Sequence, residues 1–289
     1  MCRSGLCSLL FAIVMITSAM PSAAQDDRIA SMSLERKVAQ MFMVTLHGSV
    51  LTEDGAAFLR EMQPGAVVLF AANLGSPQQV ATLTNAYQQT ILDAGGQPLL
   101  IAVDQEGGVV IRLTDGFTVF PAPILMTAAG TSMTRRVGAT VAQQLRAVGI
   151  NMNLAPVADL ETFRTNPIIF RRSFSNDPQI AAETLSSYII GTQLEGVLAT
   201  AKHFPGHGET RQDSHAVLQT LDLDRQRLES VEFIPFIGAI NAGVAAIMVA
   251  HIHYSALQPG EPLPASLDRR VVTDQLRNEM RFYGIIMTD

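Results

Sequence analysis

The sequence predicts an α/β protein whose parallel β-sheet forms a (β/α)8 barrel of the TIM type. Short apolar, β-rich runs alternate along the chain with segments of helical periodicity, which is typical of parallel sheets. Most of these runs are apolar at successive positions, as strands covered on both faces are. Polar or ionisable residues follow several runs, which favours a barrel with one central site over an open, doubly wound sheet. Since the chain ends with the seventh expected strand, we expect a barrel truncated after that strand.

The expected strands are short aliphatic runs rather than long alternating ones. In chain order they cover residues 38–46, 66–70, 99–103, 150–154, 197–201, 245–250 and 283–287. Ionisable residues stand at or near the ends of the later runs, namely Asp104, Asp159, Lys202, His251 and Asp289. No Gly-x-Gly-x-x-Gly pattern follows the first run, so the sequence offers no phosphate loop of the dinucleotide-binding kind.

The expected helices lie between these strands. They cover residues 77–92, 134–148, 177–194, 224–242 and 266–282. In the second of them Val137, Val141 and Leu145 form one apolar stripe at helical spacing. The last begins with Ser266-Leu267-Asp268, which predicts a cap at Ser266 and an acidic first turn.

The first residues predict export. Met1-Cys2-Arg3 is cationic, residues 6–19 are almost wholly apolar, and Ser22-Ala23-Ala24 provides small residues for cleavage. We expect a cleavable signal peptide over residues 1–24, since the apolar run is short for the alternative, a membrane anchor. The mature domain, residues 25–289, would be periplasmic or extracellular. Both cysteines lie in the signal segment, so the mature domain would be held by its core without disulfides.

Composition narrows the class of protein. The chain is 48% hydrophobic, which excludes a disordered protein. A net charge of -6 argues against a nucleic-acid partner, which requires a basic face. No stretch of the mature domain is long and apolar enough to span a membrane, and no repeat or linker divides it. The sequence does not specify an oligomeric state.

One segment, residues 202–215, carries most of the ionisable groups near a strand end. His203 and His207 have the spacing of a zinc-binding helix, but Pro205 and Gly206 between them disfavour a helix, so we expect no metal.

Asp213 and His215 suggest acid/base chemistry in the same segment. A carboxylate next to an imidazole orients it and favours its protonated form, which can donate a proton to a leaving oxygen. The alternative is a solvated loop with incidental charges, and the residue types alone leave both open.

The segment from Lys202 to His215 resembles the signature of the bacterial β-N-acetylglucosaminidases of glycoside hydrolase family 3. The pattern Lys-His-Phe-Pro-Gly-His-Gly, a short gap and Asp-Ser-His is matched at every fixed position. Further segments resemble the family in the same order: residues 103–108 with Arg112, 120–123, 153–159, 172–178 and 284–289.

The resemblance implies a role for each matching residue. Asp289 would be the nucleophile, and His215, with Asp213 as its partner, would be the general acid/base of a retaining double displacement. The hydroxyls of the terminal sugar would be held by Asp104, Arg112, Arg172, Lys202 and His203. No cofactor is implied.

Some of these residues have structural alternatives. Asp104 could cap a helix or form an ion pair, Arg112 could pair with it, and Arg172 has the same chemistry as its neighbour Arg171. Lys202 is one of only two lysines, so an ammonium at a buried strand end favours a site over a role in solubility. Asp159 and His251 are equally compatible with structural and supporting roles.

The expected activity is removal of terminal nonreducing N-acetylglucosamine from cell-wall fragments, including muropeptides, or from chito-oligosaccharides. The chain has no tryptophan for the aromatic platforms of a long polysaccharide groove, which favours an exo-acting pocket. The alternatives are a β-glucosidase, a glycoside phosphorylase of the same family, or a sugar-binding fragment without turnover, because the chain ends at the proposed nucleophile.

Overall fold

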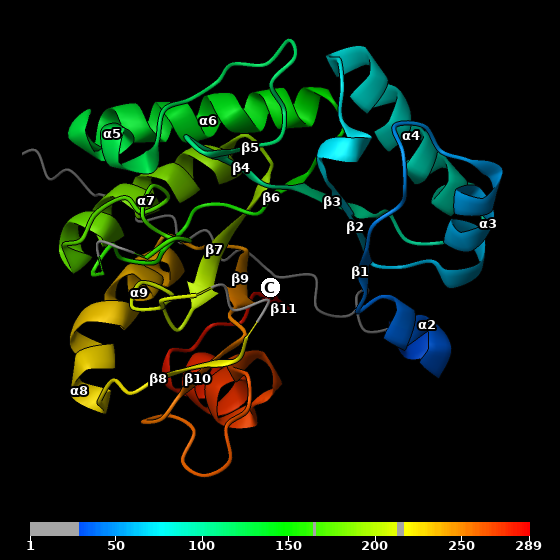
Figure 1. Cartoon of the computed structure of the whole chain (residues 1–289). Helices are drawn as coiled ribbons and strands as arrows, with labels where there is room; N and C mark the ends of the chain where they lie inside the picture. The colour runs from blue at the N-terminus through cyan, green and yellow to red at the C-terminus, as the bar shows by residue number, and fades with distance from the viewer. Residues whose placement is uncertain (1–28, 164–165, 213–216) are drawn as a thin grey trace, which may run out of the picture.

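A parallel sheet of seven strands is the centre of the computed structural model, which describes residues 29–163, 166–212 and 217–289 (Figure 1). The strands are β1 (Met43–Val44), β2 (Ala66–Leu69), β3 (Leu100–Val103), β6 (Met152–Asn153), β7 (Leu198–Phe204), β9 (Ala246–Val249) and β11 (Ile285–Thr288). They lie side by side in chain order, and every neighbouring pair is parallel. Because the order never reverses, the sheet curls in one direction and has no switch point.

Helices cover the outside of the curled sheet. They are α2 (Leu34–Ala39), α3 (Glu53–Met62), α4 (Pro77–Asp93), α5 (Pro123–Ala128), α6 (Thr131–Ala147), α7 (Pro178–Leu194), α8 (Arg225–Arg227) and α9 (Phe233–Asn241). A π-helical turn, η2 (Leu228–Glu232), joins α8 to α9. Helices α6, α7 and α9 pack next to one another on the side of β7 (Figure 1).

Local sequence explains where the long helices begin. Asp177 precedes α7, and its carboxylate accepts hydrogen bonds from the backbone N–H groups of Gln179 and Ile180. Ser76 caps α4 in the same way, and each of these helices begins with a proline, whose missing N–H would have no partner there.

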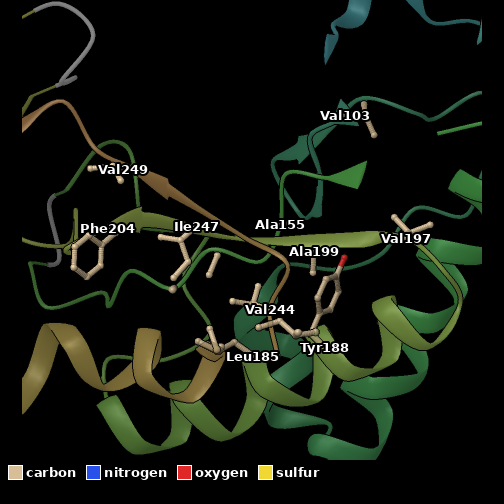
Figure 2. Packing of buried hydrophobic residues seen from close by; sticks show 14 of the residues in the cluster. Val103, Ala155, Leu185, Tyr188, Val197, Ala199, Phe204, Val244, Ile247 and Val249 are labelled. Atoms are coloured by element: carbon tan, nitrogen blue, oxygen red, sulfur yellow. The ribbon is translucent and has the colours of Figure 1, made fainter. Parts of the chain in front are cut away.

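Alternation along the strands divides the core into two layers. Side chains that face the helices, such as Ile101, Ala199 and Ile247, form the main core with residues of α7 such as Leu185; Figure 2 shows part of this packing. Side chains of the opposite parity form a smaller cluster inside the curl, made of Ala102, Met152, Leu154, Ala246 and Met248. Asp104 has the same parity as Ala102, and Lys202 has the same parity as Leu198, so both side chains point to the inside of the curl.

The structure corrects the first and last expected elements. The run at 38–46 is not one strand, because α2 includes Val38 and Ala39 and only Met43–Val44 pairs with β2. Helix α3 was not expected; Thr52 caps it, and it buries only Ala56 and Leu59.

The predicted cap at Ser266 is wrong. A short 3-10 turn, η3 (Ala265–Leu267), contains Ser266, and the π-type helix η4 (Arg270–Glu279) follows. The carboxylate of Asp268 accepts the backbone N–H of Arg270 instead, 2.9 Å away. The hydroxyl of Ser266 contacts His251, so tertiary contact determines its role.

The predicted signal peptide, residues 1–24, lies outside the described residues. Within the described ranges, no helix is both long enough and apolar enough to cross a lipid bilayer.

Candidate active site

Lys202 lies at the inner edge of the curled sheet and contacts two carboxylates. Its Nζ atom is 2.6 Å from Asp104 Oδ1 and 2.8 Å from Glu106 Oε1. Asp104 follows β3 directly, and Glu106 lies in a short hairpin formed by β4 (Gln105–Gly107) and β5 (Val110–Ile111). The fold therefore brings together residues that are 98 positions apart in the sequence.

Glu106 also binds Arg172. The two side chains form a bidentate pair, with Nε 2.9 Å from Oε2 and Nη2 2.8 Å from Oε1. The neighbouring Arg171 is exposed instead, and its guanidinium lies 5.6 Å from the ring centre of Phe170. The structure thus separates two adjacent arginines that the sequence could not tell apart.

The four charges of this cluster stabilise one another. Burial by itself would raise the pKa of Glu106, but the charges of Lys202 and Arg172 outweigh it and hold that pKa at about 2. Burial opposes the charge on Lys202 as well, yet Glu106 and Asp104 raise its pKa above the ordinary value. Glu106 therefore remains a carboxylate and Lys202 an ammonium at neutral pH.

Arg112 is placed differently from the other cations. Its backbone N–H binds the side chain of Gln105, which anchors the hairpin. Its Nε atom is buried and has no hydrogen-bond partner within the described chain. A buried donor without a protein partner is suited to bind a polar ligand.

His203 stands where the register between β7 and β9 shifts by one residue, a bulge that redirects a side chain. Its Nδ1 atom is 2.6 Å from Asp159 Oδ2, and the carboxylate of Asp159 is fully buried. The same carboxylate accepts the backbone N–H of His207 at 2.7 Å. The rings of His203 and His207 pack edge to face, with their centres 5.5 Å apart.

His207 is buried, and it is held by Thr210. The hydroxyl of Thr210 lies 2.7 Å from His207 Nδ1. Burial lowers the pKa of His207, while the charges of Asp159 and, more weakly, Asp289 act to raise it. His207 is therefore held as a neutral imidazole close to the end of β11.

Asp289 follows β11 at the level of the other site residues. The register places Lys202 opposite Met248, and Met248 opposite Met287, so Asp289 lies two positions further along its strand. Its backbone carbonyl is 2.7 Å from Nε2 of His251, whose Nδ1 contacts Ser266 at 2.7 Å. His251 thus fixes the backbone of the proposed nucleophile.

The structure groups four of the eight predicted site residues. Asp104, Lys202 and Arg172 meet around Glu106, and His203 lies next to Lys202 in the chain. Asp213 and His215 lie outside the described residues. The described ranges contain no group of three His, Cys, Asp or Glu side chains that could hold a metal.

Sequence reasoning underrated Glu106 and Asp159. Glu106 was not among the predicted site residues, yet it joins Lys202 to Arg172. The available signal was the spacing of Glu106 from Asp104, because residues two apart in an extended chain face the same side. The position of Asp159 near a strand end left structural and supporting roles equally open, because its two histidine partners come from a different strand–loop segment.

Comparison with known families agrees with this architecture. Residues 33–289 match the model of the glycosyl hydrolase family 3 N terminal domain. A beta-hexosaminidase of Nitrosomonas eutropha is 35% identical over 257 residues, covering 86% of this chain and 71% of that protein. A beta-hexosaminidase A of Pseudoalteromonas piscicida is 32% identical over 302 residues, covering 95% of this chain and 50% of that protein.

Solved structures show the same similarity. A glycoside hydrolase family 3 beta-N-acetylglucosaminidase from Paenibacillus sp. FPU-7 superposes with a TM-score of 0.86 at 38% identity, over 90% of this chain and 49% of that one. NagZ from Neisseria gonorrhoeae, solved with N-trifluoroacetyl-D-glucosamine, gives 0.80 at 31% identity, over 86% and 74%. The chain thus spans about half the length of some relatives and about three quarters of others.

Proposed function

The chain belongs to glycosyl hydrolase family 3, a glycosidase family, and we propose that it is a retaining exo-β-N-acetylglucosaminidase. The substrates would be cell-wall fragments or chito-oligosaccharides with a terminal nonreducing N-acetylglucosamine. The beta-hexosaminidase and beta-N-acetylglucosaminidase names of the relatives support this substrate class.

The observation that carries the proposal is the buried charged cluster at the carboxyl ends of β3 and β7. Asp104 and Lys202 form it with Glu106 and Arg172, and Arg112 adds a guanidinium whose Nε has no hydrogen-bond partner in the described residues. Charged donors and acceptors fixed in a buried site bind sugar hydroxyls strongly, because charge-assisted hydrogen bonds exceed neutral ones. The carboxyl-terminal edge of a curled parallel sheet is also where such folds bind their ligands.

The proposed reaction uses two steps at one carbon. The carboxylate of Asp289 attacks the anomeric carbon, the bond to the leaving oxygen breaks, and His215 donates the proton that this oxygen takes. Water then gives a proton back to His215 and attacks the same carbon, which frees Asp289 and retains the configuration. Asp213 would keep the imidazole of His215 oriented and able to carry the proton.

Turnover of chromogenic glycosides tests the activity. We expect hydrolysis of the β-N-acetylglucosaminide to exceed that of the matching β-glucoside, with a rate that inorganic phosphate leaves unchanged. Faster cleavage of the glucoside would indicate a β-glucosidase, and a sugar phosphate as product would indicate a phosphorylase. Binding of the sugar without turnover would indicate a sugar-binding protein rather than an enzyme.

A trapping experiment tests the nucleophile. A 5-fluoro N-acetylglucosaminyl fluoride is expected to leave a covalent sugar on the peptide that contains Asp289, detectable by mass spectrometry. Asp289→Asn should abolish labelling and lower kcat by about 10³-fold or more. Labelling on another carboxylate would contradict the assignment.

Two broader proposals accompany the activity. The singly wound strand order supports seven strands of a (β/α)8 barrel. A crystal structure of the protein would test whether the sheet closes into a barrel. Residues 1–24 support export to the periplasm or medium. N-terminal sequencing of the protein recovered outside the cytoplasm should then begin at Gln25, and an unprocessed cytoplasmic protein would oppose it.

A further inference from the structure

Asp159 is the most completely enclosed carboxylate near the site, and its contacts converge on one histidine. Its side chain is 0% exposed. Both of its oxygens lie 3.1 Å from the backbone nitrogen of His203, and Oδ2 lies 2.6 Å from Nδ1 of the same residue. A further bond from the backbone of His207, at 2.7 Å, fixes the carboxylate in place.

These contacts determine where His203 carries its proton. Burial acts to raise the pKa of Asp159, but the electrostatic interaction with His203 and the hydrogen bonds from His203 and His207 lower it overall, so the carboxylate is ionised and only accepts hydrogen bonds. A ring nitrogen 2.6 Å from an ionised carboxylate must therefore be the protonated one. In a neutral imidazole the other nitrogen, Nε2, is then an acceptor.

The remaining surroundings leave Nε2 available. No residue in the described part of the chain forms a hydrogen bond with it, and 4% of the side-chain surface stays exposed. Its chain neighbour Lys202 donates to Asp104 and Glu106, so the two adjacent residues offer opposite chemistry at the same strand end. One presents donors, and the other presents an acceptor.

We propose that Asp159 is a positioning residue that holds His203 in its Nδ1–H tautomer and thereby makes Nε2 the acceptor for one hydroxyl of the terminal sugar. The inference rests on the proposed function for its ligand, although the tautomer does not depend on it. The consequence is a rule of specificity: the sugar must donate a hydrogen bond at this position. Fluorine can occupy the space of that hydroxyl but cannot donate, so it should be rejected there.

The tautomer is measured first, without substrate. Nitrogen-15 NMR of the full chain, with His203 assigned through a His203→Gln variant, is expected to show an Nδ1–H tautomer at pH 7. In Asp159→Asn the carboxamide oxygen can still accept the backbone N–H, while its NH₂ group donates to Nδ1 and moves the ring proton to Nε2. An Nε2–H tautomer or an imidazolium in the unmodified protein would overturn the proposal.

Kinetics with fluorinated substrates then test the acceptor role. Among the 3-, 4- and 6-deoxyfluoro N-acetylglucosaminides, we expect one to lose about 10- to 100-fold in kcat/KM relative to the parent glycoside. In Asp159→Asn, the ratio of kcat/KM between the parent and the fluorinated glycoside should fall to within about threefold. In a His203→Ala background, the same substitution should have little further effect on this ratio. An unchanged ratio in Asp159→Asn would overturn the acceptor role.

Asp268→Asn is the matched control. Asp268 is also a largely buried, ionised carboxylate, paired with Arg270 away from the sugar cluster. Its replacement should lower the unfolding temperature without altering the fluorine ratio. Absence of any turnover in the unmodified protein, with the Nδ1–H tautomer present, would reject the proposed substrate and leave the effect of Asp159 on His203 established.

Discussion

At the scale of single residues, the positive charge of Lys202 offsets the negative charges of the site. Its ammonium is almost fully enclosed and touches two carboxylates that would otherwise repel each other. Removing one partner of a buried charge network leaves the others without compensation, which costs more than the contact itself is worth.

Lys202→Met is therefore expected to lower kcat/KM by about 10²-fold or more, because a charge-assisted contact to the sugar is lost and Asp104 and Glu106 are left with excess negative charge. Lys37→Met is the matched control, since Lys37 is the only other lysine and lies on α2. Steady-state kinetics and thermal unfolding of both variants check this. Equal activity in the two variants would contradict the role of Lys202.

Glu106 makes the free energy of unfolding depend on pH in the acid range. Its pKa is about 2 in the folded protein against 4.5 as the unperturbed value, so its contribution is complete above pH 4.5 and is lost as the pH falls toward 2. The difference corresponds to about 3 kcal/mol. Glu106→Gln should lower the free energy of unfolding at pH 7 and flatten its decline between pH 4.5 and 2, as urea titrations over this range would show. An acid decline equal to that of the unmodified protein would contradict it.

Sequence patterns identified the residue types of the site better than their pairing. Asp104, Lys202, Arg172 and His203 were all candidates, and the structure places them in one region. The partners of Arg172 and His203 were not foreseen, because Glu106 and Asp159 come from other strand ends and only the curl of the sheet brings them close.

At the scale of elements, two glycines allow close approaches with different consequences. A Cβ atom on Gly191 would lie 2.1 Å from the backbone oxygen of Arg135, where α7 crosses α6. A Cβ atom on Gly208 would lie 2.1 Å from the backbone oxygen of Leu160, where the loop that holds His207 packs against the segment after Asp159. The first contact belongs to the scaffold, and the second belongs to the site.

Gly191→Ala should destabilise the fold by about 1–3 kcal/mol, because the helices must move apart, while kcat/KM of the folded enzyme stays within about twofold. Differential scanning calorimetry with kinetics below the transition measures both. A loss of activity matching that of a site variant would show that this crossing controls the site.

Gly208→Ala should instead act on catalysis, since displacing the His207 loop by about 1 Å is enough to cost on the order of 10²-fold in rate. Gly191→Ala is its control, because it introduces the same methyl group at a close approach outside the site. Unchanged kcat/KM in Gly208→Ala would mean that the loop can shift without moving His207.

The boundaries of elements were less predictable than their presence. The strands at 66–70, 99–103 and 245–250 agree with β2, β3 and β9 within a residue, because buried aliphatic runs have few alternatives. The helix start at Arg270 follows from a local contact with the carboxylate of Asp268, two residues earlier, and β1 is short because α2 takes up the first residues of the run at 38–46.

At the scale of the whole molecule, the described sheet is most protected at its centre. Residues Ala199–Phe204 of β7 are buried throughout, whereas Ile285 and Thr288 at the ends of β11 are exposed. Strand β1, whose two residues are only half-buried, is the first in the described strand order. Protection should therefore be higher in β7 than in β1.

Hydrogen exchange followed by mass spectrometry checks this gradient. We expect peptides from β7 and β9 to exchange at least about tenfold more slowly than peptides from β1, whose two residues are only half-buried, since strands with fewer buried neighbours open locally at lower free energy. A sugar ligand should slow exchange at β11 more than at β1, because Asp289 follows β11. Uniform protection across β1, β7 and β9 would contradict the gradient.

The sequence by itself determined the class of fold, the family and the residue types of the site. Strand–helix alternation fixes a parallel sheet, because hydrophobic periodicity is a local property. The fourteen residues from Lys202 to His215 identify the family, because their chemistry is contiguous in the chain.

Only the tertiary structure decided which charges neutralise one another. Glu106 joins Lys202 to Arg172, Asp159 holds His203, and the Nε of Arg112 is left without a hydrogen-bond partner among the described residues. These partners are tens of residues apart, and a one-dimensional pattern carries no record of distance in space. The curl of the sheet sets those distances, and with them the charge that each side chain carries.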